Sequence, residues 1–207
     1  MPKSFNIIGV CIPELHYMVN TQDRIKDIAT NYIANGCYFT INRARQFGKT
    51  TTLYLLEKYL KEQYVIIRLS FEIADELFNS LYSFSKGLVY IIYNELKNQG
   101  IDKNILDKWN QPVSHEFPFN SLSRHITELC KESNKKIILM IDEIDKSSDN
   151  QIFLSFLGLL RNKYLEQQQQ RDTTFQSVIL AGVYDIKNLK LKLHPGDEPK
   201  YNIPWNI

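Results

Sequence analysis

Short apolar runs alternate with longer amphipathic segments along most of this 207-residue chain. Four apolar runs, rich in β-branched and aromatic residues, predict strands, and they span residues 37–41, 64–69, 136–141 and 176–181. Four segments with apolar residues at helical spacing predict helices, and they span residues 50–62, 77–97, 119–132 and 149–167. Strands that alternate with helices predict an α/β fold, in which helices cover both faces of a parallel sheet.

We expect one three-layer domain over residues 1–207, because no linker rich in proline, glycine or serine divides the chain. The run 136–141 is apolar on both faces, which is typical of a central parallel strand. Residues 1–36 precede the first predicted strand. The tail 193–207 contains three prolines and a glycine, so we expect it to be mostly irregular.

The composition excludes several classes of protein. Lysine and arginine number 25 against 23 for aspartate and glutamate, a net charge of +2, so the chain lacks the basic balance typical of nucleic-acid-binding proteins. The cysteines Cys11, Cys37 and Cys130 have no metal-ligand spacing, and we expect reduced thiols. The apolar runs are too short to span a membrane, and the first residues lack a secretion signal. We therefore expect a cytoplasmic protein without membrane contact.

The first predicted strand leads into a segment that matches part of a phosphate-binding loop. Parallel sheets bind ligands at the carboxyl ends of their strands, and here a strand, a loop with Gly48-Lys49-Thr50 and a helix follow one another. Gly48 would let the backbone approach phosphate oxygens, Lys49 would reach the β- and γ-phosphates, and the Thr50 hydroxyl would bind Mg²⁺. The full pattern has a glycine where this chain has Arg43. The alternative is an ordinary helix start with a capping threonine.

A second candidate motif follows the third predicted strand, where the apolar run ends in Asp142-Glu143. A carboxylate at the end of a buried strand is costly unless a cation compensates it. In P-loop proteins the strand-terminal Asp helps to hold magnesium, and an adjacent Glu can act as general base for the attacking water. The alternative is that both carboxylates cap the next segment. The two motifs in this order favour a nucleotide site.

With these motifs, the sequence resembles the AAA-like P-loop ATPases of bacteria and archaea, which are related to the STAND branch. Three stretches carry the resemblance, and they are residues 5–9 with 13–18, residues 42–51 and residues 138–145. The resemblance covers nearly the whole chain. It implies an additional-strand P-loop core of about five parallel strands, with ATP and Mg²⁺ as ligands.

The resemblance also assigns roles to individual residues. It places seven of them in the phosphate loop, namely Arg45, Gln46, Phe47, Gly48, Lys49, Thr50 and Thr51. It makes Lys49 and Glu143 catalytic, and Thr50 and Asp142 the magnesium ligands. In such proteins the segment before the core, here residues 1–36, packs near the adenine, which implies that His16 and Tyr17 contact the base. The alternative is that their rings cover the edge of the sheet.

The chain departs from this family in places that affect turnover. Its last predicted strand ends in Ala181-Gly182, where the family has a polar γ-phosphate sensor. Tyr184 or Asp185 could substitute for the sensor, and the alternative is that both are ordinary residues at the strand end. Arg43 or Arg45 could stabilise transition-state charge, hold the loop by pairing with a carboxylate, or be a solvated loop residue. Related ATPases continue into a helical lid, so the chain is either a minimal core or a fragment that stops before a lid.

We therefore expect an ATP-binding protein, with Mg²⁺-dependent ATP hydrolysis as the leading hypothesis. The alternative is a nucleotide-binding scaffold or regulatory interaction module that does not hydrolyse ATP. The family also allows a homo-oligomer or a protein partner.

Overall fold

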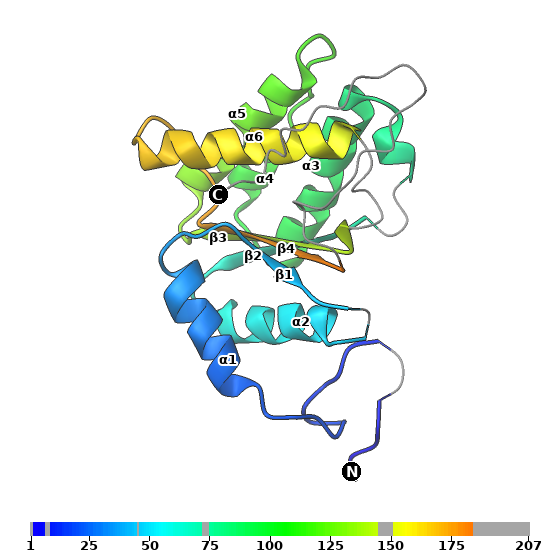
Figure 1. Cartoon of the computed structure of the whole chain (residues 1–207). Helices are drawn as coiled ribbons and strands as arrows, with labels where there is room; N and C mark the ends of the chain where they lie inside the picture. Colours follow the sequence, from blue (N-terminus) through cyan, green and yellow to red (C-terminus); the bar gives the residue numbers. More distant parts are fainter. Residues whose placement is uncertain (1, 7–8, 45, 72–74, 145–150, 184–207) are drawn as a thin grey trace.

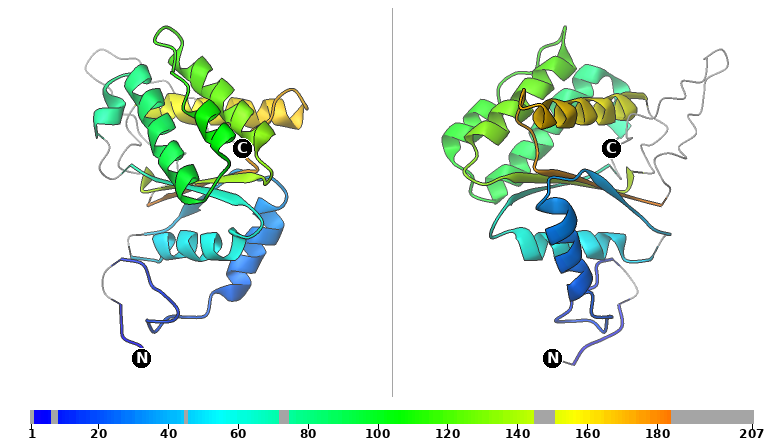
Figure 2. Two further views of the ribbon diagram at one scale, coloured as in Figure 1. Left: turned by 180° about the vertical axis from the view of Figure 1, so that it is seen from behind. Right: turned by 60° about the vertical axis from the view of Figure 1, so that its left-hand side comes forward.

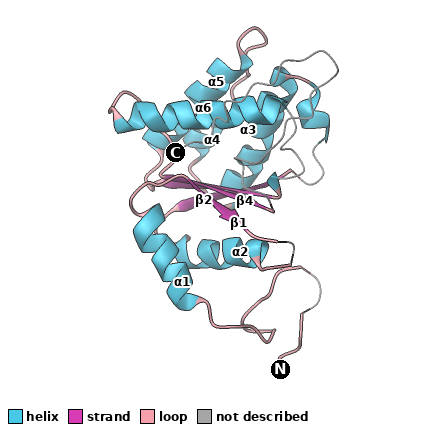
Figure 3. Ribbon diagram, in the orientation of Figure 1, coloured by secondary structure: helices cyan, strands magenta, loops and turns pink. Residues whose placement is uncertain are grey.

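The computed structural model describes residues 2–6, 9–44, 46–71, 75–144 and 151–183, and they form three layers (Figure 1). A parallel sheet is the middle layer, with helices on both of its faces (Figure 3). The strands are β1 (Phe39–Asn42), β2 (Val65–Ser70), β3 (Ile137–Asp142) and β4 (Ser177–Gly182). The predicted α/β class is confirmed.

The strand order in the sheet is β1-β4-β3-β2, and every neighbouring pair is parallel. The last strand in the chain, β4, therefore lies between the strand that precedes the loop and the strand that carries Asp142. All residues of β3 and β4 are buried, as expected of central strands. The carboxyl ends of β1, β4 and β3 consequently lie next to one another at one edge of the sheet.

One face of the sheet is covered by the N-terminal helices and by the helix that follows the loop. They are α1 (Gln22–Asp27), a π-helical continuation (Ile28–Ile33) and α2 (Lys49–Leu60). Leu53, Leu56 and Leu60 of α2 are buried, and they share an apolar cluster with alternate residues of the strands, including Ile138 and Met140. This alternation follows from the two-residue period of a strand.

The opposite face carries a thicker helical layer (Figure 2). Its elements are a short 3₁₀ helix (Asp75–Asn79), α3 (Leu81–Asn98), α4 (Lys103–Trp109), α5 (Pro118–Glu132) and α6 (Gln151–Gln168). They enclose the larger apolar cluster against Ile137, Leu139 and Ile141. Trp109 at the end of α4 is buried and donates a hydrogen bond to the Val89 carbonyl at 2.8 Å. This bond fixes α4 against α3.

The four predicted strands and four predicted helices are present, with ends that differ by a few residues from those expected. The sequence did not predict α1, its π-helical continuation or α4. Four strands lie within the described part of the chain, against about five expected. The predicted irregular tail 193–207 also lies outside the described residues. None of the described helices is both long enough and apolar enough to cross a membrane.

Candidate functional site

The two sequence motifs meet at one edge of the sheet, across a single intervening strand. Asn42 at the end of β1 pairs with Gly182 at the end of β4, and the Arg43 N–H donates to the Gly182 carbonyl at 3.2 Å. On the other side of β4, β3 ends at Asp142. The loop after β1 and the acidic end of β3 therefore border the same edge, as a phosphate site of this type requires.

The backbone of the loop turns sharply before α2 begins. Gln46 has φ 64°, and Gly48, the N-cap of α2, has φ 75°. A Cβ atom on Gly48 would meet nothing within 4 Å, so its backbone conformation rather than space favours glycine here. Gln46 and Phe47 are exposed, with 67% of Phe47 accessible. The N–H groups of the first helical turn, which have no acceptor within the helix, lie next to the loop, and the helix dipole also favours an anion there.

The Lys49 ammonium lies back across this loop. Its Nζ donates to the Arg43 carbonyl at 2.9 Å and to the Ala44 carbonyl at 3.2 Å. The positive charge is therefore held at the entrance to the loop by two neutral acceptors. Phosphate oxygens are stronger acceptors than carbonyls, so a bound phosphate could replace these two bonds.

The three threonines after Lys49 have different surroundings. The Thr51 hydroxyl oxygen accepts a hydrogen bond from the Cys11 N–H at 3.1 Å, and the Thr52 hydroxyl donates to the Gly48 carbonyl at 2.8 Å. Thr50 is half-buried, and its hydroxyl has no hydrogen-bond partner among the residues that the structure describes. The Thr50 side chain is thus available to a ligand, whereas Thr51 attaches the N-terminal segment to α2.

The end of β3 carries a buried carboxylate and a strained residue. Asp142 is only 5% exposed, and its Oδ1 accepts a hydrogen bond from the Glu143 N–H at 2.9 Å. Glu143 has φ 55°, an uncommon conformation for a residue with a side chain, and Ile144 after it is 1% exposed. Backbone strain of this kind clusters at functional sites.

The oxygen donors at this edge fit magnesium bound together with a nucleotide. Magnesium usually takes one or two protein oxygens and completes its shell with phosphate oxygens and water, and Thr50 and Asp142 supply such oxygens. Within the described ranges, no group of three or more His, Cys, Asp or Glu side chains could hold a metal ion by itself. Two protein oxygens would leave the remaining ligand positions of magnesium to phosphate oxygens and water.

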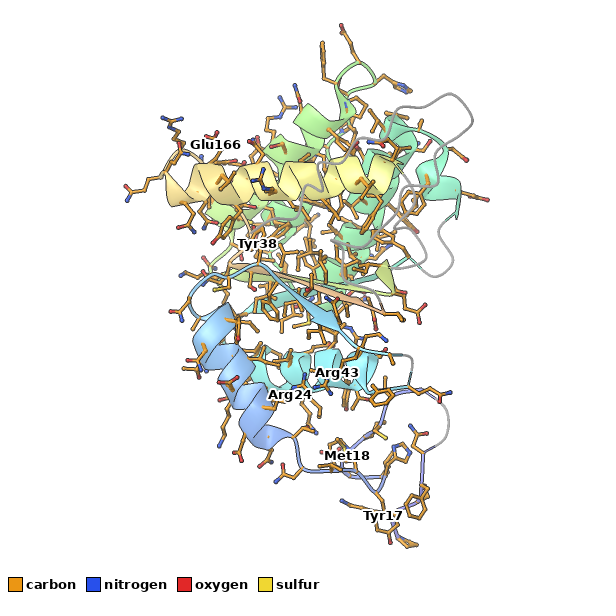
Figure 4. All side chains as sticks on the ribbon, in the orientation of Figure 1. Tyr17, Met18, Arg24, Tyr38, Arg43 and Glu166 are labelled. Atoms are coloured by element: carbon orange, nitrogen blue, oxygen red, sulfur yellow. The ribbon has the colours of Figure 1, made fainter. Side chains whose placement is uncertain are left out.

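A further cationic side chain near the loop could not be predicted from the sequence pattern. Arg24 on α1 is half-buried and lies beside Arg43 (Figure 4). Partial burial and the nearby positive charge of Arg43 hold the pKa of Arg24 below its ordinary value. Neither guanidinium has an ion pair or a side-chain hydrogen bond within the described part of the chain. The two arginines and Lys49 give this region a surplus of positive charge.

His16 and Tyr17 make their described contacts within the N-terminal segment. His16 Nδ1 accepts a hydrogen bond from the Ile12 N–H at 2.9 Å, and the Tyr17 ring lies 5.2 Å from the Phe5 ring. Tyr17 is 56% exposed, and Figure 4 shows it well away from Arg43. The predicted contact of both residues with adenine stays a prediction.

Other predicted candidates lie outside the described residues. They are Arg45 in the loop and the two substitutes for a γ-phosphate sensor, Tyr184 and Asp185. The described end of β4, Ala181-Gly182, carries no polar side chain.

Comparisons with known proteins agree with the fold. A family model described as an AAA-like domain matches residues 14–188. Among solved structures, the chain is similar to the Walker-type ATPase PABY2304 of Pyrococcus abyssi, with a TM-score of 0.50 and 15% sequence identity. The similarity covers 86% of this chain and 48% of that one, so this chain spans about half the length of its structural neighbour. At this identity the similarity shows the fold alone. Comparison with curated proteins found no match.

Proposed function

The chain belongs to the family of AAA-like domains, and we propose that it binds ATP at the loop before α2 and hydrolyses it with magnesium. One observation carries the proposal. The start of α2, with Gly48, Lys49 and Thr50, lies at the same sheet edge as the end of β3, where Asp142 is followed by Glu143, and β4 lies between them. Membership of the family supports nucleotide binding, whereas hydrolysis and the metal are the further steps of the proposal.

Phosphate binding would use the loop backbone and the lysine. The positive φ of Gly48 turns the chain so that the first N–H groups of α2 face a ligand at the edge of the sheet. Lys49 would exchange its bonds to the Arg43 and Ala44 carbonyls for bonds to phosphate oxygens. This exchange favours the bound state, because phosphate oxygens carry negative charge and attract the ammonium more strongly than neutral carbonyl oxygens do.

The Thr50 hydroxyl and the Asp142 carboxylate would hold the magnesium. When bound, the metal neutralises charge on the phosphate oxygens. In hydrolysis, the oxygen of a water molecule attacks the γ-phosphorus, the bond to the β-phosphate bridging oxygen breaks, and ADP leaves. Glu143 would accept the proton of that water, and its restrained backbone would fix the direction of its side chain.

A second function, nucleotide binding without turnover, is favoured by the end of β4. Ala181 and Gly182 carry no side chain that could hydrogen-bond a γ-phosphate, although β4 lies between the two motifs. A protein of this kind would use the bound nucleotide as a structural or regulatory ligand. The two candidate functions share the phosphate site and differ in the role of Glu143.

Thermal unfolding with and without MgATP tests the phosphate site. A ligand at about 100 times its Kd stabilises the native state by about 2.7 kcal/mol, which corresponds to a rise in Tm of several degrees for a chain of this size. We expect this rise in the wild type and in the control Lys103→Ala, since Lys103 is exposed on α4, but not in Lys49→Ala. An unchanged Tm of the wild type at millimolar MgATP would contradict the proposal.

Phosphate release by Glu143→Gln then separates the two functions. If Glu143 is the general base, this variant keeps the rise in Tm with MgATP and loses about 100-fold or more in the rate of phosphate release. If the protein only binds nucleotide, the wild type releases phosphate no faster than Glu143→Gln does.

A further inference from the structure

A cavity lies on the side of α2 that faces the N-terminal segment and α1. Its volume is about 620 Å³, within the range of about 300–1,000 Å³ that holds small organic ligands. Figure 2 shows the N-terminal segment passing beneath α1 and α2 in both views. The lining residues include none from the phosphate loop and none from the end of β3.

Apolar side chains from all three elements form much of the cavity wall. Met18 and Val19 come from the N-terminal segment, Ile25 from α1, and Leu55 and Tyr59 from α2. Val19 is 81% exposed and Tyr59 is 48% exposed, although both are large apolar residues. Exposed apolar side chains around a concave surface are typical of a ligand-binding site.

The charged residues of the cavity are mostly positive. Lys3, Lys26 and Lys58 line it together with one carboxylate, Glu14. Glu14 forms an ion pair with Lys58, and this pair, with a smaller effect of the Lys3 charge, lowers the pKa of Glu14, so the carboxylate stays negative and offsets one of the three lysines. Neither Lys3 nor Lys26 has an ion pair or a hydrogen bond from its side chain to any described residue. The cavity therefore has a surplus of two positive charges beside an apolar wall.

We propose that this cavity binds a small organic anion, with its apolar body against Leu55, Ile25 and Met18 and its acidic group toward Lys26 and Lys3. The surplus of positive charge favours a negatively charged ligand, and the apolar wall favours an apolar or aromatic body. The volume limits it to the size of a small molecule.

This site is separate from the phosphate site. Leu55 and Tyr59 follow Lys49 by six and ten residues, which places them about 9 and about 15 Å along the axis of α2 from the start of the helix. The proposal does not depend on ATP binding, because the residues that carry it are different ones.

The walls of the cavity are held together by contacts between the elements. The Cys11 N–H donates to the Thr51 hydroxyl at 3.1 Å, and the Glu14–Lys58 ion pair joins the segment to a later turn of α2. Within the segment, the Ser4 N–H donates to the Leu15 carbonyl at 3.0 Å. A ligand therefore meets a preformed surface, which lowers the cost of binding.

Fluorescence titration of the full chain with two related dyes tests the proposal. Anilinonaphthalene sulfonate carries an aromatic body and an anionic group, and phenylnaphthylamine has nearly the same body without the charge. We expect saturable binding of the sulfonate at one site, at least about tenfold tighter than that of the neutral dye. Absence of saturable binding to the wild type would overturn the proposal.

Two variants and one control test whether the dyes bind in this cavity. Lys26→Glu should weaken binding of the sulfonate about tenfold and leave binding of the neutral dye nearly unchanged, because attraction becomes repulsion between two anions. Val19→Trp should weaken binding of both dyes, because the larger ring fills the mouth of the cavity. Lys103→Glu, at an exposed lysine on α4, should change neither. Unfolding curves with unchanged midpoints would show that all three variants are folded.

Two outcomes would overturn the assignment of the site. Equal affinity of the sulfonate for the wild type, Lys26→Glu and Val19→Trp would mean that the dye binds elsewhere. Competitive displacement of the dye by MgATP would mean that the cavity is part of the nucleotide site and not a separate one. A loss of ATP binding in Lys49→Ala with unchanged dye binding would support two separate sites. If the wild type did not bind ATP at all, the dye experiment would still test the cavity.

Discussion

At the scale of single residues, left-handed backbone conformations occur in both motifs of the candidate site. Gly48 before α2 has φ 75°, and Glu143 after β3 has φ 55°. The conformation costs a glycine little, whereas it costs a residue with a Cβ atom about 1 kcal/mol or more. Glu143 keeps it because the Asp142 carboxylate accepts its N–H and the buried Ile144 fixes the next residue. With Gln46 at φ 64° in the loop, the site thus contains one relaxed position, Gly48, and two strained ones.

Gly48→Ala tests the role of the relaxed turn. We expect a loss of about 1 kcal/mol in the free energy of unfolding, because alanine is strained at this φ, and a further loss of the stabilisation by MgATP. Gly100→Ala is a matched control, because Gly100 has φ 70° and, like Gly48, has nothing within 4 Å of an added Cβ atom. Urea unfolding with and without MgATP measures both quantities. A loss of ATP response in Gly100→Ala as well would show that the effect is one of stability only.

Arg24→Gln tests the surplus of positive charge beside the loop. Removal of the charge relieves repulsion from Arg43, so we expect the ligand-free protein to keep its stability or to gain about 0.5 kcal/mol. The rise in Tm with MgATP should become smaller, because one cation near the phosphates is lost. An unchanged or higher stability without ligand, together with a smaller rise in Tm with MgATP, would distinguish an electrostatic role of Arg24 from a structural one. A destabilised variant with an unchanged ATP response would contradict this prediction.

At the scale of elements, the sequence predicted the parts with strong periodic signals. The central strands β3 and β4 are apolar on both faces, and α3, α5 and α6 each contain at least 15 residues with a buried side. In contrast, α1 and α4 have six and seven residues, too few for an apolar period to be distinct. Their positions depend on contacts with distant parts of the chain, such as the Trp109–Val89 hydrogen bond.

The same distinction applies to the candidate site. Gly48-Lys49-Thr50 and Asp142-Glu143 are local motifs, and each follows a strand, so their common edge could be predicted from the fold class. Arg24 could not, because its approach to Arg43 requires α1 to pack beside α2. The cavity depends on the path of the N-terminal segment, for which the sequence has no periodic signal.

A buried polar network joins α5, α6 and the segment before β4. Lys163 is 2% exposed, and its Nζ donates to Asp172 Oδ2 at 2.5 Å and to the Thr127 hydroxyl at 2.7 Å. Burial by itself would raise the pKa of Asp172, but hydrogen bonds from Lys163, Thr127 and the Thr173 N–H outweigh this and lower it. The network therefore compensates the buried ammonium at the amino end of β4, the opposite end of the strand from the candidate site.

Asp172→Asn should destabilise the protein by about 3 kcal/mol at neutral pH, because it leaves the buried Lys163 charge without its counter-ion. The folded-state pKa of Asp172 is lowered, so its stabilising contribution is present above the unfolded-state value of about 3.9 and is lost as the pH falls through the folded-state value. The difference between the wild type and Asp172→Asn should accordingly shrink in acid. Urea unfolding at several pH values measures it.

The exposed Lys108–Glu132 ion pair provides the control for this prediction. Glu132→Gln should cost less than about 1 kcal/mol, since solvent screens an exposed pair. If Asp172→Asn cost no more than Glu132→Gln, the buried network would contribute little to stability.

At the scale of the whole molecule, the N-terminal segment connects the two candidate ligand sites. It lies along α2, whose first turn belongs to the phosphate loop and whose later turns line the cavity. The hydrogen bond from the Cys11 N–H to the Thr51 hydroxyl joins the segment to the first turn, and the Glu14–Lys58 ion pair joins it to a later one. Because the ion pair is exposed, the hydrogen bond should contribute more to this attachment.

Thr51→Val removes the acceptor of this hydrogen bond and keeps the shape of the side chain. We expect hydrogen exchange of the Cys11 amide to become about fivefold faster, which corresponds to a net loss of about 1 kcal/mol, while exchange in β3 and β4 stays unchanged. Thr52→Val is the matched control, since the Thr52 hydroxyl bonds to the Gly48 carbonyl and not to the segment. Equal exchange of the Cys11 amide in the wild type and in Thr51→Val would show that other contacts hold the segment. Faster exchange in Thr51→Val, together with weaker binding of the sulfonate dye, would show that this single bond positions a wall of the cavity from the first turn of the phosphate-loop helix.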